Sequence, residues 1–443
     1  MTTVQPALTR FSAAQPAAKN VTPLINANRM VADFVDFAKM DTQSRADSTI
    51  HPSTPGQTVL ANKLADQLRS LGNVKDVQVD ANSVVTATVD ANLDDGTTAP
   101  VIGLVSHMDT SDQAPASNVQ PTFHNNYQGG DLVLNGGTMI PASDLTNHIG
   151  EDIITSDGTT LLGADDKSGI AEILEAVQVW GANPDIQHPK VRIAFTPDEE
   201  TAEYIDQFDI KKFGADYAYT IDGDAPEAIE DSSLNAHKAQ VSITGRSIHP
   251  GYAYGKMINA TELAGEFMAE LPADERPQTT KDDQGYYFPY ALKGSDSEAN
   301  MTLLVRDFDW QGSLRRIQFL KDTAAKIEAR HSGSTVAVAI TEQYRNFAGI
   351  LAKYPQVAQA AEEGLKRTGL KPQHKWIRGG TDGCTLTANG LPTPNLGAGG
   401  FNFHSKREFV TKQDMVRCCA NIINTLSVWA ERATKAPTAA TTP

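Results

Sequence analysis

The residues best suited to chemistry are two adjacent carboxylates, Asp165 and Asp166, in the stretch Leu162-Gly-Ala-Asp-Asp-Lys-Ser-Gly169. They lie between a short apolar run and a segment with helical spacing of apolar residues, so Asp166 could simply cap that helix. The alternative is a metal-dependent hydrolytic centre, because carboxylates and imidazoles are the ligands that paired metal ions use. This alternative gains weight because other acid and histidine clusters also follow apolar runs.

Three such clusters follow segments that are typical of buried strands. His107 and Asp109 follow 101–105, Glu199 and Glu200 follow 191–195, and Asp222 follows 217–221. Such a cluster, taken singly, is most often part of a structural turn. Two adjacent glutamates can also supply one metal ligand and one general base. Strands that alternate with helices predict a mostly parallel α/β sheet, whose ligands lie beyond the carboxyl ends of its strands. We therefore expect the clusters to meet at one edge of the sheet.

Composition narrows the classes of function. The 443 residues are 40% apolar, which is enough for two or three domains with ordinary cores. The formal charge of −16 repels phosphate backbones and anionic membrane surfaces, so we expect neither nucleic acid nor membrane as a partner. No run approaches the roughly 18 apolar residues of a membrane span. The three sparse cysteines favour a reducing, cytoplasmic compartment.

The chain divides by composition and periodicity. Residues 1–26 and 433–443 are rich in Ala, Thr and Pro and lack a periodic apolar face, so we predict flexible ends. Residues 27–233 and 346–432 form the predicted catalytic domain, in which 77–89 alternates like one strand. Residues 234–345 form an inserted α+β unit of the ferredoxin-like sort. Its expected elements are strands at 239–244, 298–308 and 334–342, and helices at 256–271 and 313–330.

Three turns rich in glycine or proline carry further polar residues. They are Ser247-Ile-His-Pro-Gly251, Arg378-Gly-Gly-Thr-Asp-Gly383 and Gly399-Gly-Phe-Asn-Phe-His404. A histidine in a turn is usually surface decoration, and glycines allow a close approach of the backbone to a ligand. None of the three turns identifies a function alone.

Read together and in order, these motifs resemble the co-catalytic di-zinc metallopeptidase family, which also includes acylamino-acid deacylases. The match runs from about residue 29 to 432. The resemblance implies a zinc-dependent aminopeptidase that removes the N-terminal residue of tripeptides by means of a water bridging two zinc ions. A related di-zinc dipeptidase or N-acyl-amino-acid deacylase is the alternative. A metal-binding protein without catalysis would require the loss of a ligand or of the base.

The resemblance also implies roles for individual residues. His107 and Asp222 would hold one zinc ion, Glu200 and His404 the other, and Asp165 would bridge both. Glu199 would be the general base, and Asp109 would orient His107. The peptide bond between Asp165 and Asp166 would be cis.

For the inserted unit, the resemblance implies a lid that forms a homodimer. His249 would reach the active site of the partner subunit and stabilise the oxyanion of the tetrahedral intermediate. Arg306, Asn259 and Arg378 would bind the backbone or carboxylate of the substrate. The chain departs from the family pattern at Thr201-Ala202-Glu203, Asp224 and Ser405, where small residues or glycine are usual, and these departures concern substrate preference.

Overall fold

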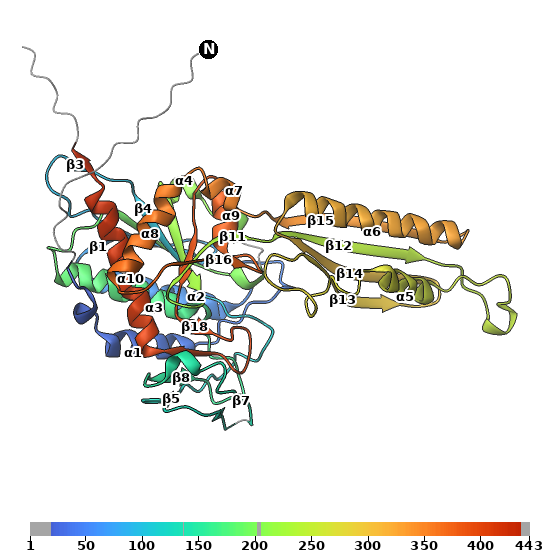
Figure 1. Cartoon of the computed structure of the whole chain (residues 1–443), viewed down its shortest axis with the longest axis horizontal. Helices are drawn as coiled ribbons and strands as arrows, with labels where there is room; N and C mark the ends of the chain where they lie inside the picture. Colours follow the sequence, from blue (N-terminus) through green and yellow to red (C-terminus); the bar gives the residue numbers. More distant parts are fainter. Residues whose placement is uncertain (1–18, 136, 202–204, 436–443) are drawn as a thin grey trace, which may run out of the picture.

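The computed structural model describes residues 19–135, 137–201 and 205–435, and its larger body is built on an eight-stranded sheet (Figure 1). In spatial order the strands are β1 (Val74–Val79), β2 (Val85–Val89), β9 (Val191–Thr196), β4 (Ile102–His107), β10 (Tyr217–Gly223), β17 (Asn395–Gly397), β11 (Ala228–Ser233) and β16 (Gln373–Ile377). Four of the seven neighbouring pairs are parallel, among them β9–β4 and β4–β10. The predicted, mostly parallel α/β sheet is confirmed.

Helices cover both faces of this sheet because successive side chains along the buried strands point in opposite directions. Leu104 and Ile193 face one layer, and Val105 and Ala194 face the other. The first layer contains α1 (Ala27–Ala38), α2 (Pro55–Ser70), α3 (Ala164–Ala182), α8 (Pro355–Arg367) and α10 (Lys412–Glu431). The second layer contains α4 (Ile210–Phe213) and α9 (Asp382–Ala388), with α7 (Ala348–Leu351) nearby.

Helix α3 approaches the sheet unusually closely at Gly169. A Cβ atom at this position would lie 2.0 Å from the carbonyl oxygen of Ile221 in β10, so only glycine fits. The contact brings the start of α3, which carries Asp165 and Asp166, beside the carboxyl end of β10, which carries Asp222.

Short elements surround the sheet. One small sheet contains β18 (Gly400–Phe401), β19 (Phe409–Thr411), β8 (Ile153–Thr155) and β5 (Thr122–His124), and two-stranded pairs join β6 (Leu132–Val133) to β7 (Met139–Ile140) and β3 (Thr97–Thr98) to β20 (Thr434–Lys435). The 3-10 helices are η1 (Thr22–Leu24), η2 (Thr146–His148), η3 (Glu199–Thr201), η4 (Ile205–Gln207) and η5 (Pro250–Tyr252).

The inserted unit projects from the body as an arm with its own apolar core (Figure 1). Its elements are β12 (Asn235–Thr244), α5 (Ala260–Glu270), β13 (Tyr286–Gly294), β14 (Glu298–Asp307), α6 (Trp310–Arg330) and β15 (Thr335–Tyr344). The strands lie in the order β13-β14-β12-β15, and every neighbouring pair is antiparallel. This βαββαβ arrangement is the expected ferredoxin-like fold.

One local prediction was wrong, and one strand was missed. The predicted strand 77–89 is two antiparallel strands, because the chain reverses at 80–84, where Ser83 has a φ of 67°. Strand β13 was not predicted, because Pro289 cannot donate to a strand ladder. The structure puts β13 at the edge of the arm's sheet, which is where a proline is tolerated.

Regular structure extends into both predicted flexible ends. Val21 and Ile25 are buried in the main core, and Lys19 pairs with Asp185 at 2.6 Å. At the other end, Thr434 pairs with Thr98 in a short two-stranded sheet. Apolar contacts and strand pairing therefore fix residues 19–26 and 433–435, while the rest of both predicted ends lies outside the described residues. Within the described part of the chain, no helix is long and apolar enough to cross a membrane.

Gly169→Ala should destabilise the protein, because the added methyl group collides with the backbone of β10. Overpacking of this kind costs about 1–3 kcal/mol. Chemical denaturation would measure the change, with Gly265→Ala in α5 as the matched control. A Cβ at Gly265 meets nothing within 4 Å, so that substitution should stabilise its exposed helix by about 0.5–1 kcal/mol. Equal stability of Gly169→Ala and the wild type would show that α3 can move away from the sheet.

Candidate metal centre

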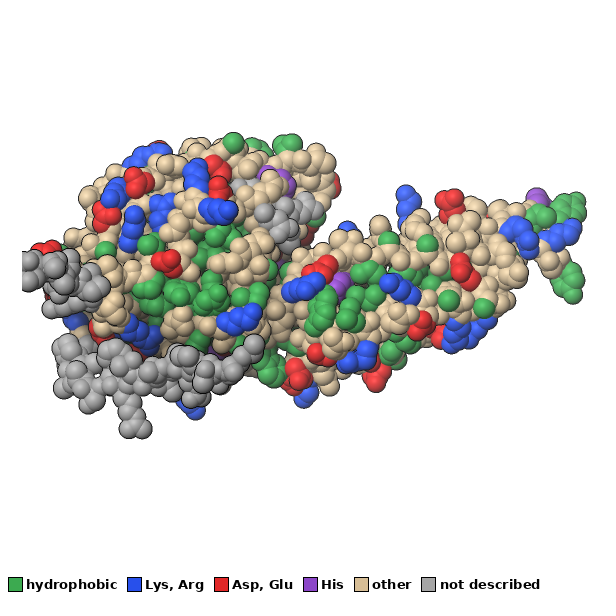
Figure 2. All heavy atoms as spheres, turned by 90° about the horizontal axis from the view of Figure 1, so that it is seen from above, with side chains coloured by type: hydrophobic (Ala, Val, Ile, Leu, Met, Phe, Trp, Pro, Cys, Tyr) green, Lys and Arg blue, Asp and Glu red, His purple; other side chains and the backbone are tan. Residues whose placement is uncertain are grey.

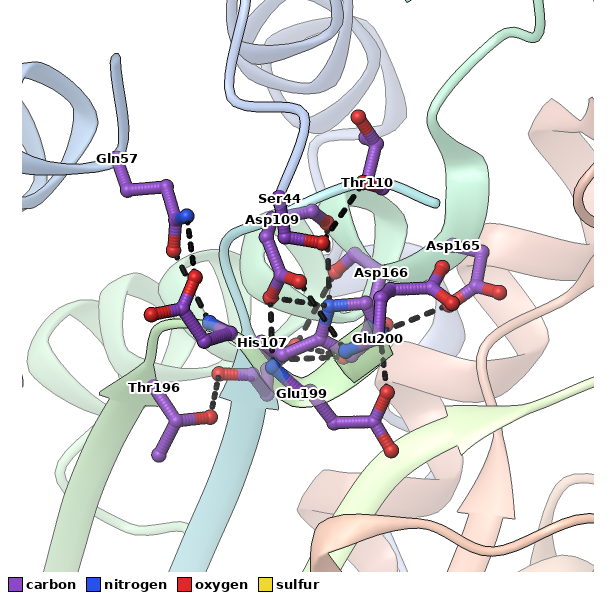
Figure 3. Close-up of polar contacts among 12 residues, drawn as sticks. Ser44, Gln57, His107, Asp109, Thr110, Asp165, Asp166, Thr196, Glu199 and Glu200 are labelled. Carbon is purple, nitrogen blue, oxygen red and sulfur yellow. Dashed lines mark hydrogen bonds and ion pairs between the residues drawn. The ribbon is translucent and has the colours of Figure 1, made fainter. Parts of the chain in front are cut away.

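Side chains from four separate stretches of the chain meet at the carboxyl ends of β9, β4 and β10. His107 is the last residue of β4, Glu199 and Glu200 form a 3-10 turn after β9, and Asp222 lies near the end of β10. Asp165 lies at the start of α3, in contact with His107 (Figure 3). The structure thus brings the predicted clusters together at one edge of the sheet.

The carboxylate of Asp165 lies between two imidazoles. Its Oδ1 is 2.9 Å from Nε2 of His107, and its Oδ2 is 3.0 Å from Nε2 of His404. The peptide bond that follows Asp165 is cis, as the resemblance implied. Because each carboxylate oxygen faces a different histidine, Asp165 has the geometry of a bridging ligand.

Each imidazole faces one further carboxylate. Nε2 of His107 is 3.5 Å from Oδ1 of Asp222, and Nε2 of His404 is 3.0 Å from Oε2 of Glu200. In a tetrahedral zinc site with bonds of about 2.0 Å, neighbouring ligand atoms lie roughly 3.3 Å apart. The observed separations fit two such sites that share Asp165.

Asp109 orients both the histidine and the glutamate pair. Nδ1 of His107 faces Asp109, at 3.1 Å from its carbonyl oxygen and 3.4 Å from Oδ1, which leaves Nε2 for the centre. The carboxylate oxygens of Asp109 also accept the backbone N–H groups of Glu199 and Glu200, at 3.0 and 3.1 Å. A partner at the outer nitrogen of a histidine fixes its tautomer and ring orientation.

Two further carboxylates hold the backbone of the centre, and of these the sequence did not single out Glu408. Glu408 accepts the backbone N–H groups of Leu162, Gly163 and Asp165 at 2.7, 2.9 and 3.0 Å, and so ties the bridging residue to the loop that carries His404. Asp198 has a φ of 57° and accepts from Ser53 and Gln57. These carboxylates act on backbone groups far away in sequence, and no spacing rule would have found these contacts.

Asp166 belongs to the scaffold, although it also lies close to His107 and Asp222. Its Oδ2 accepts from the hydroxyl of Ser106 and from the backbone N–H of His107, and its Oδ1 accepts from the backbone N–H of Gly169. With donors at both oxygens, Asp166 fixes the end of β4 against the start of α3.

The electrostatics of the centre favour bound cations. Burial raises the pKa of Asp222 to about 7 and that of Glu200 to about 8. Burial, with the charges of Asp222 and Asp382, raises the pKa of Glu199 well above its usual range against the opposing effect of His107. Burial is the main cause of these shifts, and the neighbouring carboxylates add to it.

One atom of the centre points to the same conclusion. Oε1 of Glu200 is buried and has no hydrogen-bond partner, although buried carboxylate oxygens are normally paired. The donor types, their separations and this unpaired oxygen all fit two divalent cations such as zinc.

The loop between β12 and α5, to which His249 belongs, forms the end of the arm that points away from the body (Figure 1). Nδ1 of His249 accepts the backbone N–H of Gly251 at 3.1 Å, so in the neutral ring Nε2 carries the proton. Histidine, apolar and basic side chains gather at this end of the arm, where Tyr252 and Tyr254 are 71% and 100% exposed (Figure 2).

Arg306 and Arg378 share Tyr286 as a neighbour, because Tyr286 pairs with Arg306 in the β13–β14 ladder and its ring centroid lies 5.4 Å from the guanidinium of Arg378. Arg306 is buried and donates to the carbonyl oxygens of His237 and Val305, and Asn259 caps α5. Arg378 donates to the carbonyl oxygens of Asp282 and Gln284, at 2.6 and 3.1 Å, and so connects the glycine-rich loop of the body to the arm.

The departures from the family pattern have local contacts. Thr201 donates to the carbonyl oxygen of Asp198, whereas Ala202 and Glu203 lie outside the described residues. Asp224 pairs with Lys375 at 3.0 Å. Ser405 accepts the backbone N–H of Arg407 within the loop that carries His404.

Comparison with known proteins agrees with this geometry. The model of the Peptidase family M20/M25/M40 matches residues 158–427. Peptidase T of Geobacillus kaustophilus is 40% identical over 409 residues, which are 91% of this chain and 99% of the relative. Peptidase T of Clostridium perfringens is 39% identical over 402 residues, which are 90% of this chain and 98% of the relative.

Two solved structures share the fold. Aminopeptidase PepT from Bacillus cereus has a TM-score of 0.71 at 20% identity and covers 92% of this chain and 100% of its own. A dinuclear metal-binding peptidase of the M20 family from Bacillus subtilis has a TM-score of 0.62 at 14% identity and covers 91% of this chain and 98% of its own. The family model covers more than half of the chain, and the relatives match over nearly their whole length. The chain therefore belongs to the peptidase family M20/M25/M40, as the resemblance implied, and it is a hydrolase.

Proposed function

We propose that this chain is a zinc-dependent aminopeptidase that releases the N-terminal residue of tripeptides. The observation that carries the proposal is the carboxylate of Asp165 between His107 and His404, with Asp222 and Glu200 as the outer donors. The name peptidase T, carried by relatives about 40% identical over nearly their whole length, supports a peptide substrate. His107, Asp222 and Asp165 would hold one zinc ion, which we call the first, and His404, Glu200 and Asp165 the second.

The proposed reaction needs a base, and Glu199 is the candidate. When bound, the two zinc ions would polarise the scissile carbonyl and lower the pKa of the attacking water. Glu199 Oε2 lies 3.9 Å from Nε2 of His107, at the edge of the donor group, and would accept a proton from that water. Its backbone N–H is held by Asp109, which keeps the carboxylate beside the centre, where it would pass the proton on to the leaving amine.

The proposal includes a homodimer formed through the arm. Strand β13 is the edge of the arm's sheet, and it exposes Phe288, Tyr290 and Leu292 by 40–49%. An exposed apolar edge strand is typical of a surface that pairs with another chain. In such a dimer, the Nε2–H group of His249 would serve the active site of the partner subunit as an oxyanion donor.

Substrate binding and compartment complete the proposal. Arg306, Asn259 and Arg378 remain candidates for the substrate backbone or carboxylate, and substrate would replace contacts that they now make within the chain. Cys384, Cys418 and Cys419 are buried free thiols, which suits a reducing, cytoplasmic compartment.

A substrate panel tests the proposed reaction. The zinc-loaded protein should release the N-terminal residue of tripeptides with a kcat/KM well above that for dipeptides or N-acyl amino acids. Hydrolysis is followed by chromatography of the free amino acids. Preference for dipeptides would favour the dipeptidase alternative, and preference for N-acyl amino acids would favour the deacylase.

Glu199→Gln should lower kcat by about 10² to 10⁴, because an amide cannot accept the proton of the attacking water. Metal analysis should still find about two zinc equivalents, since Glu199 is not among the proposed ligands. Glu363→Gln, on the surface of α8, is the control for the loss of one carboxylate and should be fully active. Near wild-type turnover in metal-loaded Glu199→Gln would assign the base to another residue.

His249→Ala should lower kcat by about 10² to 10³, the usual loss for one oxyanion donor, with the zinc content unchanged. Mixing this variant with Glu199→Gln under subunit exchange should restore part of the activity. Each mixed dimer would contain one site with an intact base and an intact donor. Each variant re-mixed with itself is the control, and no recovery despite verified exchange would contradict the contribution of the partner subunit.

A further inference from the structure

A buried ion cluster lies beneath the hairpin that carries His404. Nδ1 of His148 is 3.0 Å from Oε2 of Glu151 and 3.3 Å from Oδ2 of Asp414. Arg417 pairs with the other oxygen of each carboxylate, at 2.7 Å from Glu151 and 2.5 Å from Asp414. The hydroxyl of Thr411 also donates to Glu151, at 2.9 Å. The cluster therefore joins the turn around His148 to the start of α10.

The ring of His148 extends from this cluster into an aromatic group formed by the hairpin. It meets Phe401 and Phe409 edge-on, with ring centroids 4.8 and 5.4 Å away. Phe401 and Phe409 stack on each other at 5.0 Å. Phe401 belongs to β18 and Phe409 to β19, so His148 touches both strands that lead into the loop of His404.

The strand ladder of the hairpin is short, so its loop depends on a few bonds of its own, such as that from the backbone N–H of Arg407 to Ser405, and on contacts with its surroundings. β18 contains two residues and β19 three, and they share two residue pairs. Within the loop, Asn402 and His404 have φ values of 56° and 59°, in the left-handed region that residues other than glycine adopt infrequently. Such conformations persist only where the surroundings impose them.

We infer that His148 is a positioning residue for the second metal site. Its ring packs against Phe401 and Phe409, and its Nδ1 pairs with Glu151 and Asp414. These contacts fix the hairpin that presents His404. The inference rests on the proposed two-zinc centre. His148 has no contact with His107 or Asp222, so its influence should fall on the second site alone. Residues that orient metal ligands from outside typically change metal affinity by about 10- to 100-fold.

The same donor atoms could instead hold a metal ion, because His148, Glu151 and Asp414 converge in the manner of ligands. The positioning role is favoured because Arg417 already balances part of the carboxylate charge at hydrogen-bond distance. A third zinc equivalent in the wild type that His148 variants alone lose would overturn the inference.

The test is the affinity of each site for zinc, measured on the full-length protein by competition with chelators of known affinity. His148→Phe keeps an aromatic ring but removes the hydrogen bond to Glu151 and the ion pair with Asp414. Phe401→Leu keeps the ion cluster but removes the ring contact, and it covers the case in which His148→Phe does not fold. Each should weaken the second zinc ion about 10- to 100-fold and leave the first unchanged.

A double-mutant cycle separates positioning from general destabilisation. In a His404→Ala background, which lacks the second site, His148→Phe should leave the affinity for the remaining zinc ion unchanged. His188→Phe is the matched control, because His188 is also buried and packs on an aromatic ring, that of Trp180 at 4.8 Å, outside the metal centre. It should leave both affinities unchanged.

Unchanged affinities in His148→Phe and Phe401→Leu, or an equal loss at both sites, would overturn the positioning role while leaving the two-zinc proposal intact. Fewer than two zinc equivalents in the wild type would contradict the two-zinc proposal and, with it, this inference.

Discussion

The arrangement of the centre depends on one carboxylate, that of Asp165, which lies between histidines from distant parts of the chain. A buried carboxylate can face two donor groups at once only if its backbone is held rigidly. Glu408 supplies part of that rigidity by accepting backbone N–H groups on the residues before Asp165 and on Asp165 itself. Since Glu408 follows His404 closely in sequence, the same contact fixes two of the three proposed ligands of the second metal, Asp165 and His404, relative to each other.

The sheet positions the remaining polar residues of the centre. β9, β4 and β10 are adjacent and parallel, so their carboxyl ends meet, and each delivers a polar cluster to the same edge. Asp109 then links two of these strand ends, because it faces His107 and also accepts from the backbone of Glu199 and Glu200. Gly169 lets α3 come close enough to complete the group with Asp165.

The sequence was most informative where periodicity and chemistry coincided. Apolar runs that precede His107, Glu200 and Asp222 predicted the parallel strands and the edge of the sheet where these residues meet. This was possible because the local pattern of apolar residues indicates where a buried strand ends. Contacts between a side chain and distant parts of the chain leave no such pattern, which is why Glu408 and His148 were not found. Pro289 hid the edge strand β13, since its residue type opposes the strand that tertiary contacts impose. Arg306 and Arg378 illustrate a further limit, because a sequence does not reveal which donors the chain itself already uses.

The proposed catalytic groups are divided between two units, and this division has a physical consequence. The proposed metal donors and Glu199 lie in the body, whereas His249 belongs to the loop between β12 and α5, at the end of the arm that projects away from the body (Figure 1). In the proposed dimer, the approach of the partner's arm would bring the oxyanion donor and exclude water in one movement. The donor is already prepared, because the bond from Gly251 leaves the proton of the neutral imidazole on Nε2. A donor with a fixed tautomer needs little reorganisation when negative charge develops on the substrate, and preorganisation of this kind is what makes an oxyanion site effective.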